Sequence, residues 1–321
     1  MKKLLVSLAL VGALCLVPAA SMAKTYVTFG TGGTGGTFYA VGAAMSKVLN
    51  SKVKDVSANA ESTGASVENC RLLGAKKIEF GFSATDALYA AYLGKREFKT
   101  PLSNLRLLLI GYSGAFHTLV GADSKYKSIK DLKGAKVASY PGNTSEFQVP
   151  SLMSIFGVTR KDYKTVPLRP SEQVQAFRDG AVDCIFSSLG VPNSSIMDLA
   201  STHKMRFLPI EGKYADESVK KFPFFPKTVI PANSYTGQTK AVHTVGTPIV
   251  LVTRAGVPDK LITEFMNMVA NNKKELSQIH KAAGAFRPEK MKGSVYIPLH
   301  KAAAKWYRDK GILKDTNPLW K

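Results

Sequence analysis

The chain has 321 residues, of which 45% are hydrophobic and 21% charged, a composition typical of a globular protein. Its formal net charge is +21, but the lysines are dispersed along the chain and not gathered in one patch with aromatic residues. Because of this dispersed pattern we expect no nucleic acid partner. The positive charge indicates a solvated surface that steers anionic ligands.

The first residues predict export. An apolar stretch from Leu4 to Pro18 follows two lysines, and Ser21-Met22-Ala23 places small residues at the −3 and −1 positions of a cleavage site. We therefore expect a cleaved signal peptide over residues 1–23 and a periplasmic protein. The stretch is shorter than the roughly 20 residues that a spanning helix needs. Lipidation at Cys15 is the alternative, which the bulky leucine before it disfavours.

A loose internal repeat is the most informative pattern in the remaining chain. In the first half an apolar strand, Tyr26 to Gly30, runs into a loop of Gly and Thr, and an amphipathic helix follows from about Phe38 to Leu49. In the second half a strand from Lys136 to Ser139 runs into a loop over residues 140–145 and a helix that ends at Gly157. Each unit continues with a helix, Gly-Ala and a strand ending in Ser. The alternation predicts two α/β lobes built on parallel sheets.

The two lobes need connecting segments. We expect extended crossovers at Leu105 to Val120 and at His243 to Thr253, and further helices around Pro258 to Gln278 and Ser294 to Lys310. The predicted division is lobe 1 at residues 24–112 plus 250–321, and lobe 2 at residues 113–249.

The glycine-rich loop predicts a binding site. Gly30 to Gly35 matches the dinucleotide pattern G-x-G-x-x-G, but a run of Gly and Thr satisfies many patterns, and we expect no cofactor in an exported chain. Glycines let the backbone approach a ligand, and free N–H groups at a helix start attract anions. Glu61 to Ser66 and Pro141 to Ser145 offer the same chemistry. Three helix starts in one cleft would hold a carboxylate, although each could simply be a well-capped helix.

Catalytic and metal-binding patterns are missing from the sequence. It contains no G-x-S-x-G, H-E-x-x-H or C-x-x-C motif, so an enzyme is a distant alternative. The five histidines are scattered, and we expect neither a metal site nor catalytic residues. Cys70 and Cys184 fall in predicted elements and are expected to be buried thiols.

Two motifs also carry a family resemblance. VTFGTGGTGGTFY at residues 27–39 and ESTGASVENCRLL at residues 61–73 resemble the TAXI (TRAP-associated extracytoplasmic immunogenic) receptors. Three later segments are similar in the same order: 83–94, 128–134 and 230–238. The resemblance implies a type II periplasmic-binding-protein fold, with two α/β lobes joined by crossover strands around a ligand cleft.

The resemblance also implies a function. Such receptors capture a small organic anion by hinge closure, either a dicarboxylate, a 2-oxo acid or an acidic amino acid such as glutamate or 2-oxoglutarate. They deliver it to the fused permease of an ion-gradient-driven TRAP transporter, without catalysis and as monomers. A binding protein of an ABC importer or a sensor system on the same fold is the alternative.

The ligand-binding residues that the resemblance implies lie in the three loops. They are Thr34, Gly35, Gly36, Thr37, Tyr39, Ser62, Thr63, Ser66, Asn69, Gly142, Asn143, Thr144 and Ser145. No single arginine stands out as a clamp for the anion, and Arg71, Arg169 and Arg254 remain open as candidates.

Overall fold

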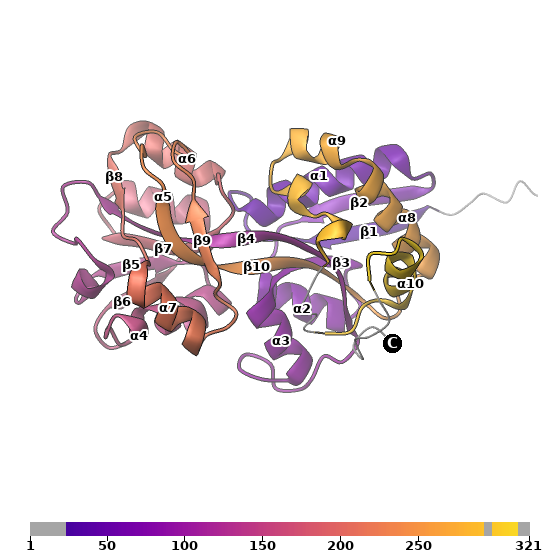
Figure 1. Ribbon diagram of the computed structural model, residues 1–321, viewed down its shortest axis with the longest axis horizontal. Helices are drawn as coiled ribbons and strands as arrows, with labels where there is room; N and C mark the ends of the chain where they lie inside the picture. Colours follow the sequence, from indigo (N-terminus) through magenta and orange to yellow (C-terminus); the bar gives the residue numbers. More distant parts are fainter. Residues whose placement is uncertain (1–23, 292–296, 314–321) are drawn as a thin grey trace, which may run out of the picture.

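A computed structural model describes residues 24–291 and 297–313, so the predicted signal peptide lies outside the described residues. The chain forms two α/β lobes side by side, joined by the long strands β4 (Leu105–Gly121) and β10 (Val242–Arg254) (Figure 1). The predicted fold, two α/β lobes with crossover strands between them, is confirmed.

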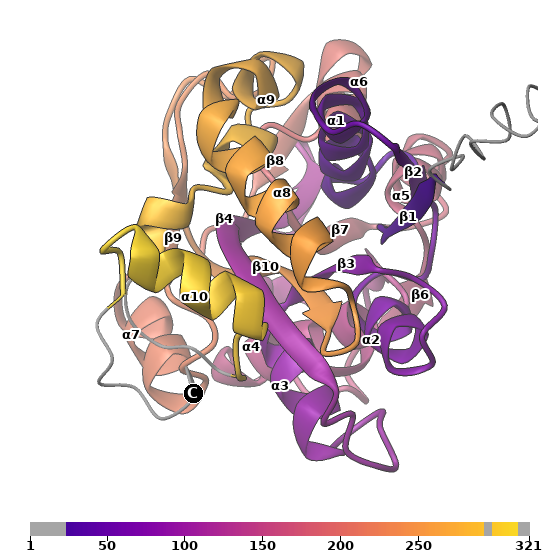
Figure 2. The same cartoon turned by 90° about the vertical axis from the view of Figure 1, so that its right-hand side faces the viewer.

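The first lobe is a parallel sheet with helices on both faces. Strands β2, β1 and β3 are hydrogen-bonded in that order, and β10 joins β3 in antiparallel register. Helices α8, α9 and α10 lie in front of the sheet when the lobe is seen from its outer end (Figure 2). Its elements are β1 (Thr25–Gly30), α1 (Thr37–Lys52), β2 (Val56–Glu61), α2 (Ser66–Gly74), β3 (Phe80–Ala84), α3 (Thr85–Leu93), α8 (Asp259–Asn271), α9 (Lys273–Ile279) and α10 (Lys301–Asp309).

The second lobe repeats the pattern. Strand β7 pairs with β4 in antiparallel register, and β5 lies parallel to both β7 and β6. Its elements are β5 (Lys136–Ser139), a π-helical turn (Thr144–Gln148), α4 (Val149–Ile155), β6 (Lys164–Pro167), α5 (Pro170–Arg178), β7 (Cys184–Leu189), α6 (Ser194–Thr202), β8 (Met205–Phe207), α7 (Gly212–Lys221) and β9 (Lys227–Ile230), with a short 3₁₀ turn before β5 (Ile129–Leu132).

Each lobe buries its own aromatic core. In lobe 1, the ring of Phe80 contacts those of Phe29 and Phe265, with centroids 4.9 and 4.7 Å away. In lobe 2, Phe116 meets Phe225 edge to face at 5.5 Å. Buried aromatic pairs of this kind stabilise each core beyond their simple burial.

In the described part of the chain, β4 and β10 are the only strands that run through both lobes. They pair with each other in antiparallel register from Leu105–Arg254 to Ala115–Gly246, and this ladder is irregular between Pro248 and Val252. A break in the ladder lowers the cost of bending at that point. The boundaries expected after residues 112 and 249 fall inside these strands. We propose the irregular step between Pro248 and Val250 as the hinge, because from Ile249 onward β10 also pairs with β3 of lobe 1.

Two predicted helices differ in the structure. The helix expected from Pro258 to Gln278 is interrupted at Asn272, whose φ of −119° and ψ of 30° are not helical and whose side-chain amide donates to the carbonyl of Met268 at 2.8 Å. The last helix begins at Lys301 because His300 caps it, accepting from the N–H of Ala302, whereas residues 292–296 of the prediction lie outside the described part. Among the described residues, no helix combines the length and apolar character needed to cross a membrane.

Candidate functional site

The cleft lies where the strands of both lobes end. In an open parallel sheet, ligands bind outside the carboxyl ends of the strands, where the following helices begin. In lobe 1 these ends lead into the starts of α1, α2 and α3. In lobe 2 they lead into the π-helical turn, α5 and α6. Both sets of helix starts therefore face the same space.

A cavity occupies this space. About 560 Å³ between its walls is free of atoms, a volume that includes space open to solvent. Aromatic and aliphatic side chains line it together with hydroxyls and amides. The lining residues are Gly32, Gly33, Gly36, Thr37, Phe38, Ala65, Ser66, Ala84, Tyr112, Gly114, Tyr140, Asn143, Thr144, Gln148, Pro170, Ser188, Leu189, Gly190, Thr247 and Ile249.

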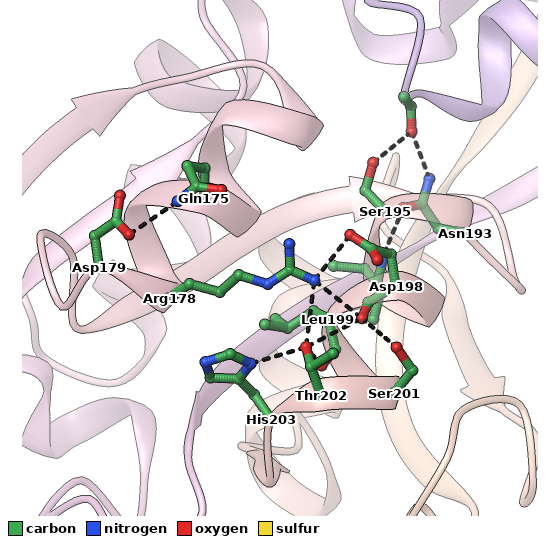
Figure 3. Close-up of polar contacts among 12 residues, drawn as sticks. Gln175, Arg178, Asp179, Asn193, Ser195, Asp198, Leu199, Ser201, Thr202 and His203 are labelled. Atoms are coloured by element: carbon green, nitrogen blue, oxygen red, sulfur yellow. Dashed lines mark hydrogen bonds and ion pairs between the residues drawn. The ribbon is translucent and has the colours of Figure 1, made fainter.

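The lobes touch directly around the cavity. The N–H of Gly190 donates to the hydroxyl of Thr37 at 3.1 Å. Ser195 and Asn193 both point at one backbone carbonyl of the opposite lobe, that of Gly35, at 3.0 and 3.4 Å (Figure 3). Because each of these bonds joins one lobe to the other, the structure is that of the closed state.

A second group of contacts closes the other sides. The hydroxyl of Tyr140 donates to the carbonyl of Thr63 at 3.2 Å and accepts from the N–H of Gly33 at 3.0 Å. The amide of Gln148 donates to Asp86 across the lobes at 3.0 Å. Tyr140 and Gln148 line the cavity, so closure and the ligand space share side chains.

Close approach of the backbones depends on glycine at two positions. A Cβ at Gly190 would lie 2.5 Å from Cγ2 of Thr37, and a Cβ at Gly35 would lie 2.5 Å from Oγ of Ser195. Both contacts cross between the lobes. Any larger residue would therefore hold the lobes apart.

Lobe 1 presents hydrogen-bond donors to the cavity. No described side chain caps α1 at Gly36, α2 at Ala65 or α3 at Ala84. The first-turn N–H groups of a helix have no partner within it, and they carry partial positive charge. Lobe 2 differs because Asn193 caps α6 at 3.2 Å and Glu172 accepts from the N–H at the start of α5 at 2.8 Å. The π-helical turn has no side-chain cap, but the N–H groups of Ser145 and Glu146 bond to the backbone carbonyls of Tyr140 and Gly142. An anionic group therefore has its best site on the lobe 1 wall.

The backbone is strained at the start of α2. Ala65 has φ 62° and ψ −144°, a conformation that side-chain-bearing residues rarely adopt, and it lines the cavity. Its N–H is held by the hydroxyl of Thr63 at 3.1 Å. Thr63 in turn donates to Asn69 at 2.7 Å, whose amide anchors the carbonyls of Thr31 and Phe82 at 2.8 Å each. This buried network holds the strained turn against the cleft.

The structure separates the predicted site residues into two groups. Five line the cavity: Gly36, Thr37, Ser66, Asn143 and Thr144. The other eight do not: Thr34, Gly35, Tyr39, Ser62, Thr63, Asn69, Gly142 and Ser145. Of these, Gly35 joins the lobes, whereas Thr63 and Asn69 support the first loop from behind. Thr34 and Ser62 are exposed.

Several lining residues have no motif to mark them. Tyr112, Gly114, Thr247 and Ile249 lie on the crossover strands, and Ser188 and Leu189 lie at the end of β7. Their position at the cleft depends on how the strands cross between the lobes. Tyr140 is the exception, because it directly precedes the loop that was identified from the sequence.

None of the lining residues carries a formal charge. Arg71 donates to the carbonyl of Glu97 at 2.7 Å, and Arg254 pairs with Glu79 at 3.4 Å. Arg169 is exposed, and its aliphatic stem packs near Gly33 without lining the cavity. None of the three candidate arginines therefore reaches the ligand space in this closed state, and hydroxyls, amides and helix starts supply its polarity.

Burial keeps the tyrosines of the site protonated. It raises the pKa of Tyr112, whose hydroxyl shares a hydrogen bond with Thr37, and it raises the pKa of Tyr140. Beside the cleft, burial lowers the pKa of His117 to about 4. His117 contacts the hydroxyl of Tyr235 at 2.7 Å, and that hydroxyl accepts from the N–H of Asn193 at 3.1 Å. A neutral histidine thus supports the loop that meets Gly35.

The fold is that of periplasmic binding proteins. The aliphatic sulphonate binding protein SsuA of Escherichia coli superposes with a TM-score of 0.50 at 16% identity, covering 91% of this chain and 95% of that chain. A structure described as a periplasmic transporter gives 0.55 at 13% identity, covering 81% and 87%. A binding protein component of an ABC phosphonate transporter of Pseudomonas aeruginosa gives 0.51 at 12% identity, covering 82% and 80%.

The family follows from the sequence match. The model of the NMT1-like family matches residues 29–311, nearly the whole described chain. The chain belongs to the NMT1-like family.

The predicted membership of the TAXI receptors was wrong. The matching family is NMT1-like, and the solved structures that share the fold include a component of an ABC transporter. The TRAP transporter, its fused permease, and glutamate or 2-oxoglutarate as ligands depended on the TAXI resemblance and are corrected with it. The sequence motifs that carried the TAXI resemblance form glycine- and hydroxyl-rich helix starts. Such starts reflect the chemistry of a cleft, and they do not specify which membrane transporter it serves.

Proposed function

We propose that this protein is a periplasmic solute-binding receptor that closes over one small organic anion. The observation that carries the proposal is the cavity between the two lobes, whose lobe 1 wall includes helix starts without side-chain caps. Anions bind at such starts because the free N–H groups point at the ligand. The anionic group lies against the N–H groups that begin α1 and α2, and the hydroxyl of Ser66 adds a donor. The protein acts by binding, without catalysis.

We propose an ABC importer as the membrane partner. Support comes from the fold shared with the binding protein of an ABC phosphonate transporter. Closure changes which surfaces the two lobes present together, and a permease can recognise that difference. The strong positive charge of the chain favours attraction of anions toward the cleft.

The ligand is a compact acid. A sulphonate or a phosphonate suits a wall of N–H donors, and the binding proteins of similar fold are named for these two groups. The cavity has no charged side chain with which to pair the acid, so dipoles and hydrogen bonds hold it. Aliphatic and aromatic residues such as Phe38, Leu189 and Ile249 receive the carbon chain.

A thermal-shift screen tests the proposal. The mature protein, stripped of ligand by unfolding and refolding, is mixed with alkyl sulphonates, alkyl phosphonates, carboxylates, neutral amides and sugars. Binding to the native state alone stabilises it by about 2.7 kcal/mol at a hundredfold excess of ligand over Kd. We expect a clear shift with acids of one class. Stabilisation by sugars or amides, with no acid effective, would contradict the anionic site.

A further inference from the structure

The two walls of the cavity differ in hydrogen-bonding character. Lobe 1 offers donors at its helix starts, as described above. The opposite wall includes the polar side chains of Asn143, Thr144, Ser188 and Thr247, and we call these four residues the acceptor wall. A hydroxyl can both donate and accept, so its character toward a ligand depends on where its single proton goes.

Asp86 determines the direction of these bonds. This carboxylate lies behind the cavity, 2% exposed, and forms an ion pair with Arg96 at 3.3 Å. A carboxylate only accepts, so Gln148 must turn its NH₂ group toward Asp86, at 3.0 Å. Its carbonyl oxygen then faces Thr144, whose hydroxyl donates to it at 3.0 Å. Thr144 therefore has only lone pairs left for a ligand.

Two further hydroxyls are committed in the same way. Thr247 donates to the carboxylate of Asp86 at 3.4 Å. Ser188 donates to the carbonyl of Gly114 at 3.1 Å. Each lines the cavity with its proton directed away from the ligand space. Both therefore present lone pairs, as Thr144 does.

Asn143 completes the wall. Its side-chain oxygen is buried and has no hydrogen-bond partner among the described residues, although the residue is only 6% exposed. A buried acceptor without a partner is costly, and a donor beside it removes the cost. The amide of Asn143 also carries an NH₂ group, so the acceptor character of the wall comes from Thr144, Thr247 and Ser188. The N–H groups of Ser145 and Glu146, at the start of the π-helical turn, are not free to donate because they bond to the carbonyls of Tyr140 and Gly142.

We infer that the ligand carries a hydrogen-bond donor, a hydroxyl or an ammonium group, at the end opposite its anionic group. The anionic end lies on the lobe 1 helix starts, and the donor end lies on the acceptor wall. This inference rests on the proposed function, and it narrows the ligand to hydroxy- or amino-substituted acids. Asp86 acts as a positioning residue that sets this preference through Gln148 and Thr247.

Matched acids test the inference. Dissociation constants are measured by calorimetry for ethanesulphonate, 2-hydroxyethanesulphonate and 2-aminoethanesulphonate, for their propane counterparts, and for the corresponding phosphonates. We expect a donor-bearing acid to bind about tenfold or more tightly than the plain alkyl acid of equal length, since one added buried hydrogen bond has that effect. Comparison of the hydroxyl and the ammonium compounds distinguishes the two donors.

Variants show whether the acceptor wall causes the preference. Thr144→Val keeps the shape of the side chain and removes the lone pairs. We expect it to weaken the donor-bearing acid about tenfold and the plain acid less than twofold. Thr263→Val is the matched control, because Thr263 is exposed on α8 and its hydroxyl bonds only to the carbonyl of Asp259 among the described residues. A merely structural role of Thr144 would weaken both acids equally.

The outcomes separate this inference from the proposed function. Plain alkyl acids that bind as tightly as their hydroxy and amino counterparts would overturn the inference and leave the anion receptor intact. An equal loss of both acids in Thr144→Val would also overturn it. Failure of every acid in the panel to bind would overturn the proposed function and the inference together.

Discussion

Closure of the lobes depends on the absence of a side chain at residue 190. In Gly190→Ala the added Cβ would lie 2.5 Å from Cγ2, 2.8 Å from Oγ1 and 3.1 Å from Cβ of Thr37. All three atoms belong to the opposite lobe, and the backbone of Gly190 does not have the positive φ that disfavours alanine. The clash therefore exists only when the lobes are closed.

The magnitude follows from the cost of overpacking. An added methyl group in a packed site costs about 1–3 kcal/mol, and the shortest contact here lies below any distance that carbon atoms normally allow. Since only the closed state bears this cost, the ligand-bound state is destabilised relative to the open one. Affinity is then expected to fall roughly 5- to 150-fold, because 1.4 kcal/mol corresponds to a factor of ten.

Two assays together test this reasoning. Calorimetry gives the affinity for the acid found in the screen, and X-ray scattering reports whether the ligand still makes the protein more compact. Gly121→Ala is the matched control, because the only atom near its added Cβ is Cβ of Ser124 at 3.9 Å. Unchanged affinity and compaction in Gly190→Ala would refute the closure contact. A lowered melting temperature of the ligand-free protein would show a clash within one lobe instead.

Three further predictions concern single groups. Tyr140→Phe removes the hydroxyl that joins Gly33 to Thr63, so we expect about tenfold weaker binding by calorimetry, whereas Tyr39→Phe, outside the cavity, serves as its control. Equal effects of the two would contradict it. The folded-state pKa of His117, about 4 against 6.5 unfolded, means that the unfolded chain binds the proton first, so stability falls by roughly 3 kcal/mol as pH drops from 6.5 to 4. When the free energy of unfolding is measured in urea at several pH values, His117→Gln should lose most of this pH dependence. A smaller pH dependence of the same sign should remain from His280 and His300, because burial also lowers their pKa values. An unchanged pH dependence counts against the buried neutral histidine. Burial raises the pKa of Cys70 to about 12 and raises the pKa of Cys184, so a thiol reagent at pH 8 should label neither in the native protein and both in denaturant. Labelling of the native protein would place a thiol at the surface.

Local sequence patterns predicted the fold well. The Gly-Thr run before Phe38 and the Tyr140–Ser145 loop are the junctions where β1 meets α1 and β5 meets the π-helical turn. Such junctions are set by residues close together in the chain, through glycine, proline and the apolar period. Leu105 to Val120 was recognised as a crossover because its apolar run lies between the two units. Asn272 was missed because one amide that bonds backward to a carbonyl leaves no periodic trace.

The site was predicted less completely. Thr37, Ser66, Asn143 and Thr144 line the cavity because loops that begin helices end at the cleft. Gln148 could not be predicted from the sequence, since its role depends on Asp86 in the other lobe. A bond between lobes is set by how they close, and no local pattern records it. The transporter type was predicted incorrectly for a similar reason, because helix-start motifs describe how an anion is held and not where it is delivered.

The most direct test of the central claim is a crystal structure of the mature protein with the acid identified by the screen. The proposed function predicts that the anionic group lies within hydrogen-bond distance of the N–H groups that begin α1 and α2, near Thr37 and Ser66, with the lobes closed over it. An anionic group paired instead with a lysine or arginine side chain, or a ligand outside the space between the lobes, would contradict it.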